Sequence, residues 1–245
     1  MTYDFISRER YTDTSEIVRF KLNGRDSVVV RPDNPLPGNP TVWRTEYFEA
    51  FDAVDKEMLK RGWHICHHNV RSMYGSPTAL TYLHEFYEFA KQTFNLAAKP
   101  VLFGFSVGGL FAVNYAASYG DEIGALYLDA PVLDIHDWPC RKELRDNPWW
   151  RDCMKWYGLT EQTLDSFAAI PLAKTEAVAH LPIIIVAGLV DTVVRWERNG
   201  SIFVKKLEAL GANLKVILKP DCDHHPHSVE DPLPVADFIC ENILR

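Results

Sequence analysis

The residues with the clearest chemical meaning lie in a short glycine-rich segment around Ser106. The sequence GFSVGG, residues 104–109, follows an apolar stretch at 100–103 and precedes another at 110–117. The first stretch has the length of a buried strand and the second that of a helix, so the serine is predicted in a tight strand-to-helix turn. We expect a Cβ at either flanking glycine of the Gly-x-Ser-x-Gly motif to collide with its neighbours. The turn then exposes the serine hydroxyl, which is typical of a nucleophile.

A serine nucleophile needs a base that accepts its proton, and the base needs an acid that fixes its orientation. Where the serine lies in such a turn, the chain order is serine, acid, histidine. Asp191 follows the apolar run 181–187, and His224 follows the apolar run 214–218. Side chains that follow parallel strands meet at one edge of the sheet. We therefore predict Ser106, Asp191 and His224 as the catalytic residues.

The sequence offers alternatives for both partners of the serine. Asp129 and Asp134 lie at and just after an earlier predicted strand and are alternative acids. His225 and His227 compete with His224 as the base. We favour His224 because it is the first histidine after its strand.

Histidines gather at two places in the sequence, residues 64–68 and 224–227. Such clusters can bind a metal ion, but neither has the HExxH spacing or a comparable carboxylate spacing. We therefore expect no metal site and no cofactor.

The negative charge that develops on a substrate oxygen needs backbone N–H donors, which form an oxyanion hole. One donor is predicted to be Val107, at the start of the helix that follows the serine. The second is expected from the segment 38–44, after the predicted hairpin. Pro40 has no N–H to donate. The remaining candidates are Thr41, Val42 and Trp43.

The other segments supply the strands and helices that position these residues. An Asn-Gly turn at 23–24 predicts a β-hairpin over residues 16–30. Strands then alternate with helices, which is typical of a mostly parallel sheet covered on both faces. The predicted strands are 64–68, 100–103, 125–128, 181–187 and 214–218, and the predicted helices include 46–61, 78–94, 202–210 and 235–244.

One long interruption separates the predicted strands at 125–128 and 181–187, and it contains four of the seven tryptophans. We interpret residues 135–180 as a small helical cap inserted into a single α/β domain that spans residues 1–245. Indole faces suit aromatic acids and sugar rings, and packing of the cap explains the tryptophans equally well. The predicted substrate-binding residues are Trp43, Trp138, Trp149 and Trp150.

Composition and charge limit the classes of partner. The chain has 245 residues, 47% hydrophobic and 24% charged, as in an ordinary soluble globular protein. A net charge of -7 without a basic stripe argues against nucleic acid, and no apolar run reaches the length of a membrane span. The N-terminus lacks the apolar part of a signal peptide. The five cysteines are scattered, so we expect free thiols and a cytoplasmic location.

Together these motifs resemble the α/β-hydrolase superfamily over nearly the whole chain. The segments GNPTVWR (38–44), DAPVLD (129–134) and HHPHS (224–228) also resemble a bacterial group of esterase-like α/β-hydrolases, some of which accompany carbohydrate-degrading enzymes. The resemblance implies the roles already predicted for the serine, the acid and the histidine. Two positions depart from the group's pattern. Asp223 stands where a glycine usually precedes the histidine, and Arg195 stands where a proline usually follows the Asp191-x-Val-Val stretch.

The sequence thus predicts a serine carboxylesterase with an α/β-hydrolase fold that acts on a small-molecule ester. Candidate substrates are acylated carbohydrates and small aromatic or acyl esters. One alternative is a peptidase of the prolyl-oligopeptidase type, and another is a hydrolase-like binding protein with little turnover. We expect neither a nucleic-acid nor a membrane partner, and the sequence sets no oligomeric state.

Overall fold

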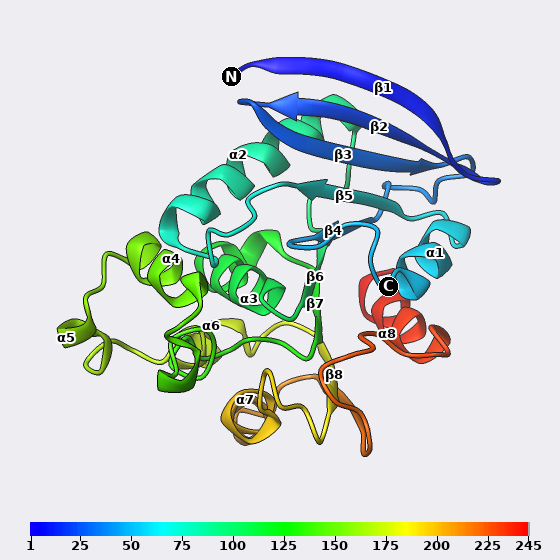
Figure 1. Ribbon diagram of the computed structural model, residues 1–245. Helices are drawn as coiled ribbons and strands as arrows, with labels where there is room; N and C mark the ends of the chain where they lie inside the picture. The colour runs from blue at the N-terminus through cyan, green and yellow to red at the C-terminus, as the bar shows by residue number, and fades with distance from the viewer. Residues whose placement is uncertain (245) are drawn as a thin grey trace.

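The strands of the protein form one nine-stranded sheet in the order β1-β2-β3-β5-β4-β6-β7-β8-β9 (Figure 1). The computed structural model describes residues 1–244. Neighbouring strands from β1 to β5 in that order are antiparallel, and those from β5 to β9 are parallel. The strands are β1 (Tyr3–Thr12), β2 (Ser15–Leu22), β3 (Arg25–Pro32), β4 (Thr41–Arg44), β5 (His64–His68), β6 (Val101–Phe105), β7 (Ala125–Asp129), β8 (Ile183–Gly188) and β9 (Leu214–Lys219).

Helices cover both faces of this sheet, as expected for strands that are apolar on both sides (Figure 1). Apolar side chains of α1 and α8 share one buried cluster, and those of α2, α3, α4, α6 and α7 share a larger one on the opposite face. The helices are α1 (Ala53–Lys60), α2 (Pro77–Phe94), α3 (Gly108–Tyr119), α4 (Pro148–Tyr157), α5 (Glu161–Leu164), α6 (Thr175–Val178), α7 (Gly200–Ala209) and α8 (Leu233–Ile243).

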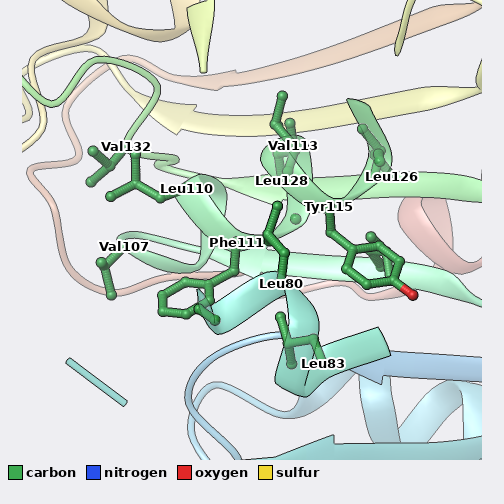
Figure 2. Close-up of a cluster of buried hydrophobic side chains, with 14 of the residues drawn as sticks. Leu80, Leu83, Val107, Leu110, Phe111, Val113, Tyr115, Leu126, Leu128 and Val132 are labelled. Carbon is green, nitrogen blue, oxygen red and sulfur yellow. The ribbon is translucent and has the colours of Figure 1, made fainter. Parts of the chain in front are cut away.

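Helix α3, which begins just after Ser106, is buried on nearly every side. Each residue from Gly108 to Ala116 is buried, which explains an apolar sequence without helical periodicity. Figure 2 shows Leu80 and Leu83 of α2 beside Phe111 of α3 in the larger cluster. The helix is therefore held rigidly from several directions, and so is the turn at its start.

The structure confirms the predicted fold class, a mostly parallel sheet with helices on both faces. The predicted hairpin is β2 and β3, in which Leu22 pairs with Arg25 across a turn where Asn23 and Gly24 both have positive φ. Strand β5 has the predicted limits, His64–His68.

Three elements differ from the prediction. Strand β1 was not predicted, because it is a mostly exposed edge strand with a polar sequence. Strand β4 is missing from the predicted strands, because four residues are too few to show an alternating pattern. Helix α1 begins at Ala53 and not at residue 46, since left-handed residues occur at 47, 49 and 51.

The chain between β7 and β8 contains only short helices, among them α4, α5 and α6. This segment, residues 130–182, is called the insertion below, and its interpretation as a cap remains a prediction. All five cysteines are free thiols. None of the helices in residues 1–244 is both long and apolar enough to cross a membrane.

Two adjacent glycines after Ser106 differ in the space available for a Cβ atom, and this difference can be tested. A Cβ on Gly109 would lie 2.7 Å from the Pro131 Cβ and 2.8 Å from the Val132 carbonyl oxygen. A Cβ on Gly108, the second glycine of the motif, meets no atom closer than 3.4 Å, so the predicted collision is wrong there. We expect Gly109→Ala to lower the free energy of unfolding by about 1–3 kcal/mol.

The matched variant Gly108→Ala should leave stability nearly unchanged, because its methyl group has room and alanine favours a helix. Urea unfolding followed by circular dichroism measures both. Equal destabilisation by the two variants would contradict the assignment of the tight contact to Gly109.

Candidate active site

Ser106 occupies a strained turn between β6 and α3. Its φ is 49°, in the left-handed region that disfavours a side chain. Its N–H donates to the Asp129 carbonyl oxygen at 2.9 Å, and its own carbonyl accepts the Val132 N–H at 2.9 Å. These two bonds tie the turn to the end of β7. The added Cβ of a residue at Gly104 would lie 2.8 Å from the Ala112 Cβ, as expected for that flanking glycine.

A continuous hydrogen-bond chain joins Ser106, His224 and Asp191. The distance between Ser106 Oγ and His224 Nε2 is 2.9 Å, and that between His224 Nδ1 and Asp191 Oδ2 is 2.8 Å. Asp191 follows β8 and His224 follows β9, so the carboxyl ends of two neighbouring strands bring them together. Because a carboxylate can only accept, Nδ1 carries the proton and Nε2 faces the serine as an acceptor. This geometry allows His224 to take the proton from Ser106.

The Asp191 carboxylate is held by its own loop. Its Oδ1 accepts the Val193 N–H at 2.9 Å and the Val194 N–H at 2.8 Å. The side chain is almost fully buried, so these donors replace water around the charge. One carboxylate oxygen therefore caps the loop and the other contacts His224.

The alternative acids lie elsewhere. Asp134 Oδ1 binds the ring and the backbone N–H of its neighbour His136. Asp129 Oδ1 lies 2.7 Å from His227 Nδ1, and its Oδ2 accepts the Ser228 N–H. Neither carboxylate bonds to His224.

Asp223, which departs from the resemblance, links the two loops that carry the acid and the histidine. Its carboxylate accepts the Thr192 N–H at 2.8 Å and the His224 backbone N–H at 2.7 Å, and it is exposed. These two backbone donors lower the pKa of the Asp223 carboxyl. The carboxylate therefore holds the backbone of His224 and makes no hydrogen bond to its ring.

Arg195, the second departure, binds the insertion. Its guanidinium pairs with Asp137, with 2.6 Å between Nε and Oδ1. Asn199 donates to the other Asp137 oxygen at 2.8 Å and accepts the Leu133 N–H. The arginine thus ties the loop after Asp191 to the insertion, which a proline could not do.

The structure corrects the predicted second oxyanion donor. Thr41, Val42 and Trp43 lie inside β4 and are fully buried; all three pair with β5, and Val42 and Trp43 also pair with β6. A strand in the middle of a sheet uses its N–H groups in the ladder. None of these three residues lines the cavity beside Ser106.

Three other N–H groups fit the role. Within residues 1–244, the N–H groups of Val107, Glu46 and Tyr47 make no hydrogen bond. All three residues line the same cavity as Ser106. Glu46 and Tyr47 follow the end of β4, a few residues later in the chain than the candidates predicted from the sequence.

A cavity of about 430 Å³ opens beside Ser106. Trp138 and Trp149 of the insertion line it, with ring centroids 6.0 Å apart, and Tyr74 continues this aromatic wall. The other two predicted tryptophans lie outside. Trp43 stacks on Tyr87 in the core, and Trp150 is buried in the insertion.

Glu46 is a polar residue of the cavity that the sequence prediction missed. It is only 4% exposed, and its Oε2 has no hydrogen-bond partner among the described residues. Burial raises the pKa of Glu46 to about 7, although the charge of Arg71 acts in the opposite direction. Glu46 directly follows the carboxyl edge of the sheet, and this position could have identified it once β4 was recognised.

The two histidine clusters differ in how their side chains are arranged. His64, His67 and His68 lie on β5 and alternate between the faces of the sheet, and burial lowers the pKa of each ring. One ring nitrogen from each of His224, His225 and His227 lies within 4.8 Å of the other two, so the structure brings the second cluster together.

The sequence matches one family of known proteins. The profile of the Esterase family, described as "Putative esterase", matches residues 52–221. No curated protein matches the sequence significantly.

Solved structures share the fold at low sequence identity. An S-formylglutathione hydrolase from Agrobacterium tumefaciens is 15% identical with a TM-score of 0.65, over 98% of this chain and 99% of that one. A cold-adapted esterase from an Arctic intertidal metagenomic library, solved with zinc bound, is 12% identical with a TM-score of 0.66, over 99% and 100% of the two chains. An acylaminoacyl peptidase from Pyrococcus horikoshii is 14% identical with a TM-score of 0.63, over 92% of this chain and 38% of its own.

The raised pKa of Glu46 predicts a pH-dependent effect on stability. In the unfolded chain the carboxyl ionises near pH 4.5, whereas in the folded protein it holds its proton to about pH 7. The folded state therefore binds more protons between these values, so this group lowers the free energy of unfolding as pH rises from 4.5 to 7. Glu46→Gln removes this contribution. Relative to the wild type, the variant should gain about 2–3 kcal/mol between pH 4.5 and pH 8.

Denaturant unfolding at several pH values measures this difference. The control is Glu49→Gln, since Glu49 belongs to the same loop but is exposed, and its difference from the wild type should stay nearly constant. A constant difference for Glu46→Gln as well would show that Glu46 titrates like an exposed carboxyl.

Proposed function

The chain belongs to the Esterase family, and we propose that it hydrolyses carboxylic esters with Ser106 as the nucleophile, His224 as the base and Asp191 as the acid that orients the base. The observation that carries this proposal is the hydrogen-bond chain from Ser106 Oγ through His224 to Asp191. Family membership and the esterase neighbours support ester hydrolysis in general. The serine mechanism is our inference from the geometry.

The proposed reaction has two steps. Ser106 Oγ attacks the carbonyl carbon while its proton moves to His224 Nε2, and collapse of the tetrahedral intermediate expels the alcohol, which takes that proton. Water then gives a proton to His224 and attacks the carbonyl carbon of the acyl-enzyme. When this second tetrahedral intermediate collapses, the acid is released and Ser106 Oγ takes the proton back from His224. Asp191 stabilises the imidazolium in both steps. We assign the oxyanion to the N–H of Val107 together with that of Glu46 or Tyr47.

The walls of the cavity support a substrate with a flat ring. Trp138, Trp149 and Tyr74 offer aromatic faces, while Glu46 and Arg71 offer an acceptor and a donor for hydroxyl groups. A small aromatic ester or an acylated sugar fits this combination. Free thiols at all five cysteines fit the reducing conditions of a cytoplasmic location, which we also propose.

A panel of substrates distinguishes these ester classes from the alternatives. It should contain acetylated sugars, aryl esters, S-formylglutathione and an acylaminoacyl peptide, because the structural neighbours include enzymes named for the last two. Preference for the peptide would favour the peptidase alternative. Absence of turnover on every ester, without labelling by a fluorophosphonate, would favour a binding protein.

We predict that Ser106→Ala abolishes ester hydrolysis while the fold is retained. Alanine fits the turn but lacks the hydroxyl, and the loss of a nucleophile in such a group typically lowers kcat by on the order of 10⁴ to 10⁶. Steady-state kinetics, fluorophosphonate labelling and circular dichroism measure the three properties. His224→Ala and Asp191→Asn should also be strongly impaired, whereas Asp134→Asn should keep most activity. Near-native turnover of Ser106→Ala would exclude this mechanism.

The position of Asp223 makes a second prediction for the pH profile. Its carboxylate bonds to the His224 backbone and not to the ring, and exposed charges interact weakly. Asp223→Gly should therefore shift the acidic limb of kcat/KM by less than about half a pH unit. It should lower kcat, since the link to Thr192 is lost.

The matched control is Asp221→Gly, an exposed aspartate of the same turn for which no hydrogen bond to His224 is found. This variant should leave both the acidic limb of the kcat/KM profile and the value of kcat unchanged. A shift of a full pH unit on replacing Asp223 would show that its carboxylate acts on the imidazole ring.

A further inference from the structure

Three histidines of one loop converge beside the cavity. His224, His225 and His227 lie between β9 and α8, and one ring nitrogen of each lies within 4.8 Å of those of the other two. The three pairs of ring centroids are 4.7–4.9 Å apart, and the rings meet edge to face.

Carboxylates bind the Nδ1–H groups of the two buried rings, and Nε2 of His224 accepts the Ser106 hydroxyl at 2.9 Å. Nδ1 of His224 donates to Asp191 at 2.8 Å, and Nδ1 of His227 donates to Asp129 at 2.7 Å. Each ring thus presents a lone pair at Nε2. Histidines that bind metals usually donate their other N–H to a carboxylate in this way, which fixes the ring and raises its basicity.

Charge and ligand type point to one class of ion. Asp129 and Asp191 place two buried carboxylates behind the rings, and these compensate a dication. His225 is exposed at the rim of the cavity, where an ion from solvent can reach it. Imidazole ligands suit Zn²⁺, Cu²⁺ and Ni²⁺, whereas Mg²⁺ and Ca²⁺ prefer oxygen.

We propose that His224, His225 and His227 form a binding site for one divalent transition-metal ion such as Zn²⁺, and that the bound ion inhibits ester hydrolysis. The inhibition rests on the proposed function, in which His224 Nε2 uses its one lone pair to accept the Ser106 proton. That lone pair cannot bind a metal and accept the Ser106 proton together. Three protein ligands leave a fourth position toward the cavity for water.

Binding is tested separately from activity. Calorimetric titration of the full chain with ZnCl₂ should give one ion per chain for the wild type. His225→Ala should bind at least about tenfold more weakly, because it removes a ligand on the exposed side without disturbing a buried pair. His180→Ala, an exposed histidine outside the cluster, and Ser106→Ala should bind like the wild type. Equal affinity of the wild type and His225→Ala would overturn the site.

A second variant tests the role of the carboxylate behind the ring. Asp129→Asn should weaken Zn²⁺ binding by about 10- to 100-fold, as is typical when the partner of a metal-bound histidine is changed. Circular dichroism establishes that each variant is folded before titration. Unchanged affinity in folded Asp129→Asn would contradict the part assigned to His227.

Measurement of ester hydrolysis provides the last test of the proposal. Zn²⁺ should inhibit the wild type and a chelator should restore it, while His225→Ala should need at least about tenfold more Zn²⁺ for the same inhibition. Full turnover of the zinc-saturated wild type would overturn the inhibitory role. Should Ser106→Ala remain active, the proposed mechanism fails, yet the calorimetric result still decides whether the metal site exists. If Zn²⁺ does not bind while Ser106→Ala is inactive, only the metal proposal fails.

Discussion

The left-handed turn at Ser106 is the constraint on which the rest of the site depends. The turn is costly for a residue with a side chain, and it is held by two backbone bonds to the end of β7 and by α3, which is buried along most of its length. Because these partners belong to the core, the backbone of Ser106 cannot move without disturbing the centre of the sheet. The histidine and the acid can then come from loops, since they need only meet a fixed point.

Buried carboxylates around this turn are stabilised to different degrees. Asp191 and Asp129 each bond to a histidine and to backbone N–H groups, so their charges are compensated. Glu46 lies in the same region with one oxygen unpaired. A buried carboxylate without partners favours its proton, which separates Glu46 from the other two at neutral pH. An ionised Glu46 beside the proposed oxyanion donors would repel the negative charge of the transition state, so a neutral carboxyl suits its position.

What the sequence could predict follows from how local each signal is. The Asn23-Gly24 turn determines its hairpin within a few residues, and glycines around Ser106 mark the turn directly. Asp191 and His224 could be found because each follows a clear apolar strand. The oxyanion donors could not be placed, because the end of β4 depends on pairing with strands distant in the sequence. The burial of Glu46 and the separation of Trp43 from the cavity depend on tertiary packing in the same way.

The loop after β9 shows how closely a base and a metal ligand are related. A carboxylate fixes the proton on Nδ1 of both His224 and His227, and both residues line the cavity. One such ring beside a serine hydroxyl is suited to proton transfer. Three rings within reach of one another are suited to a dication as well. The same electrostatic arrangement therefore suits imidazole both to proton transfer and to metal binding. His225 forms no carboxylate pair in the structure, and among these two roles it has a part only in the proposed metal binding.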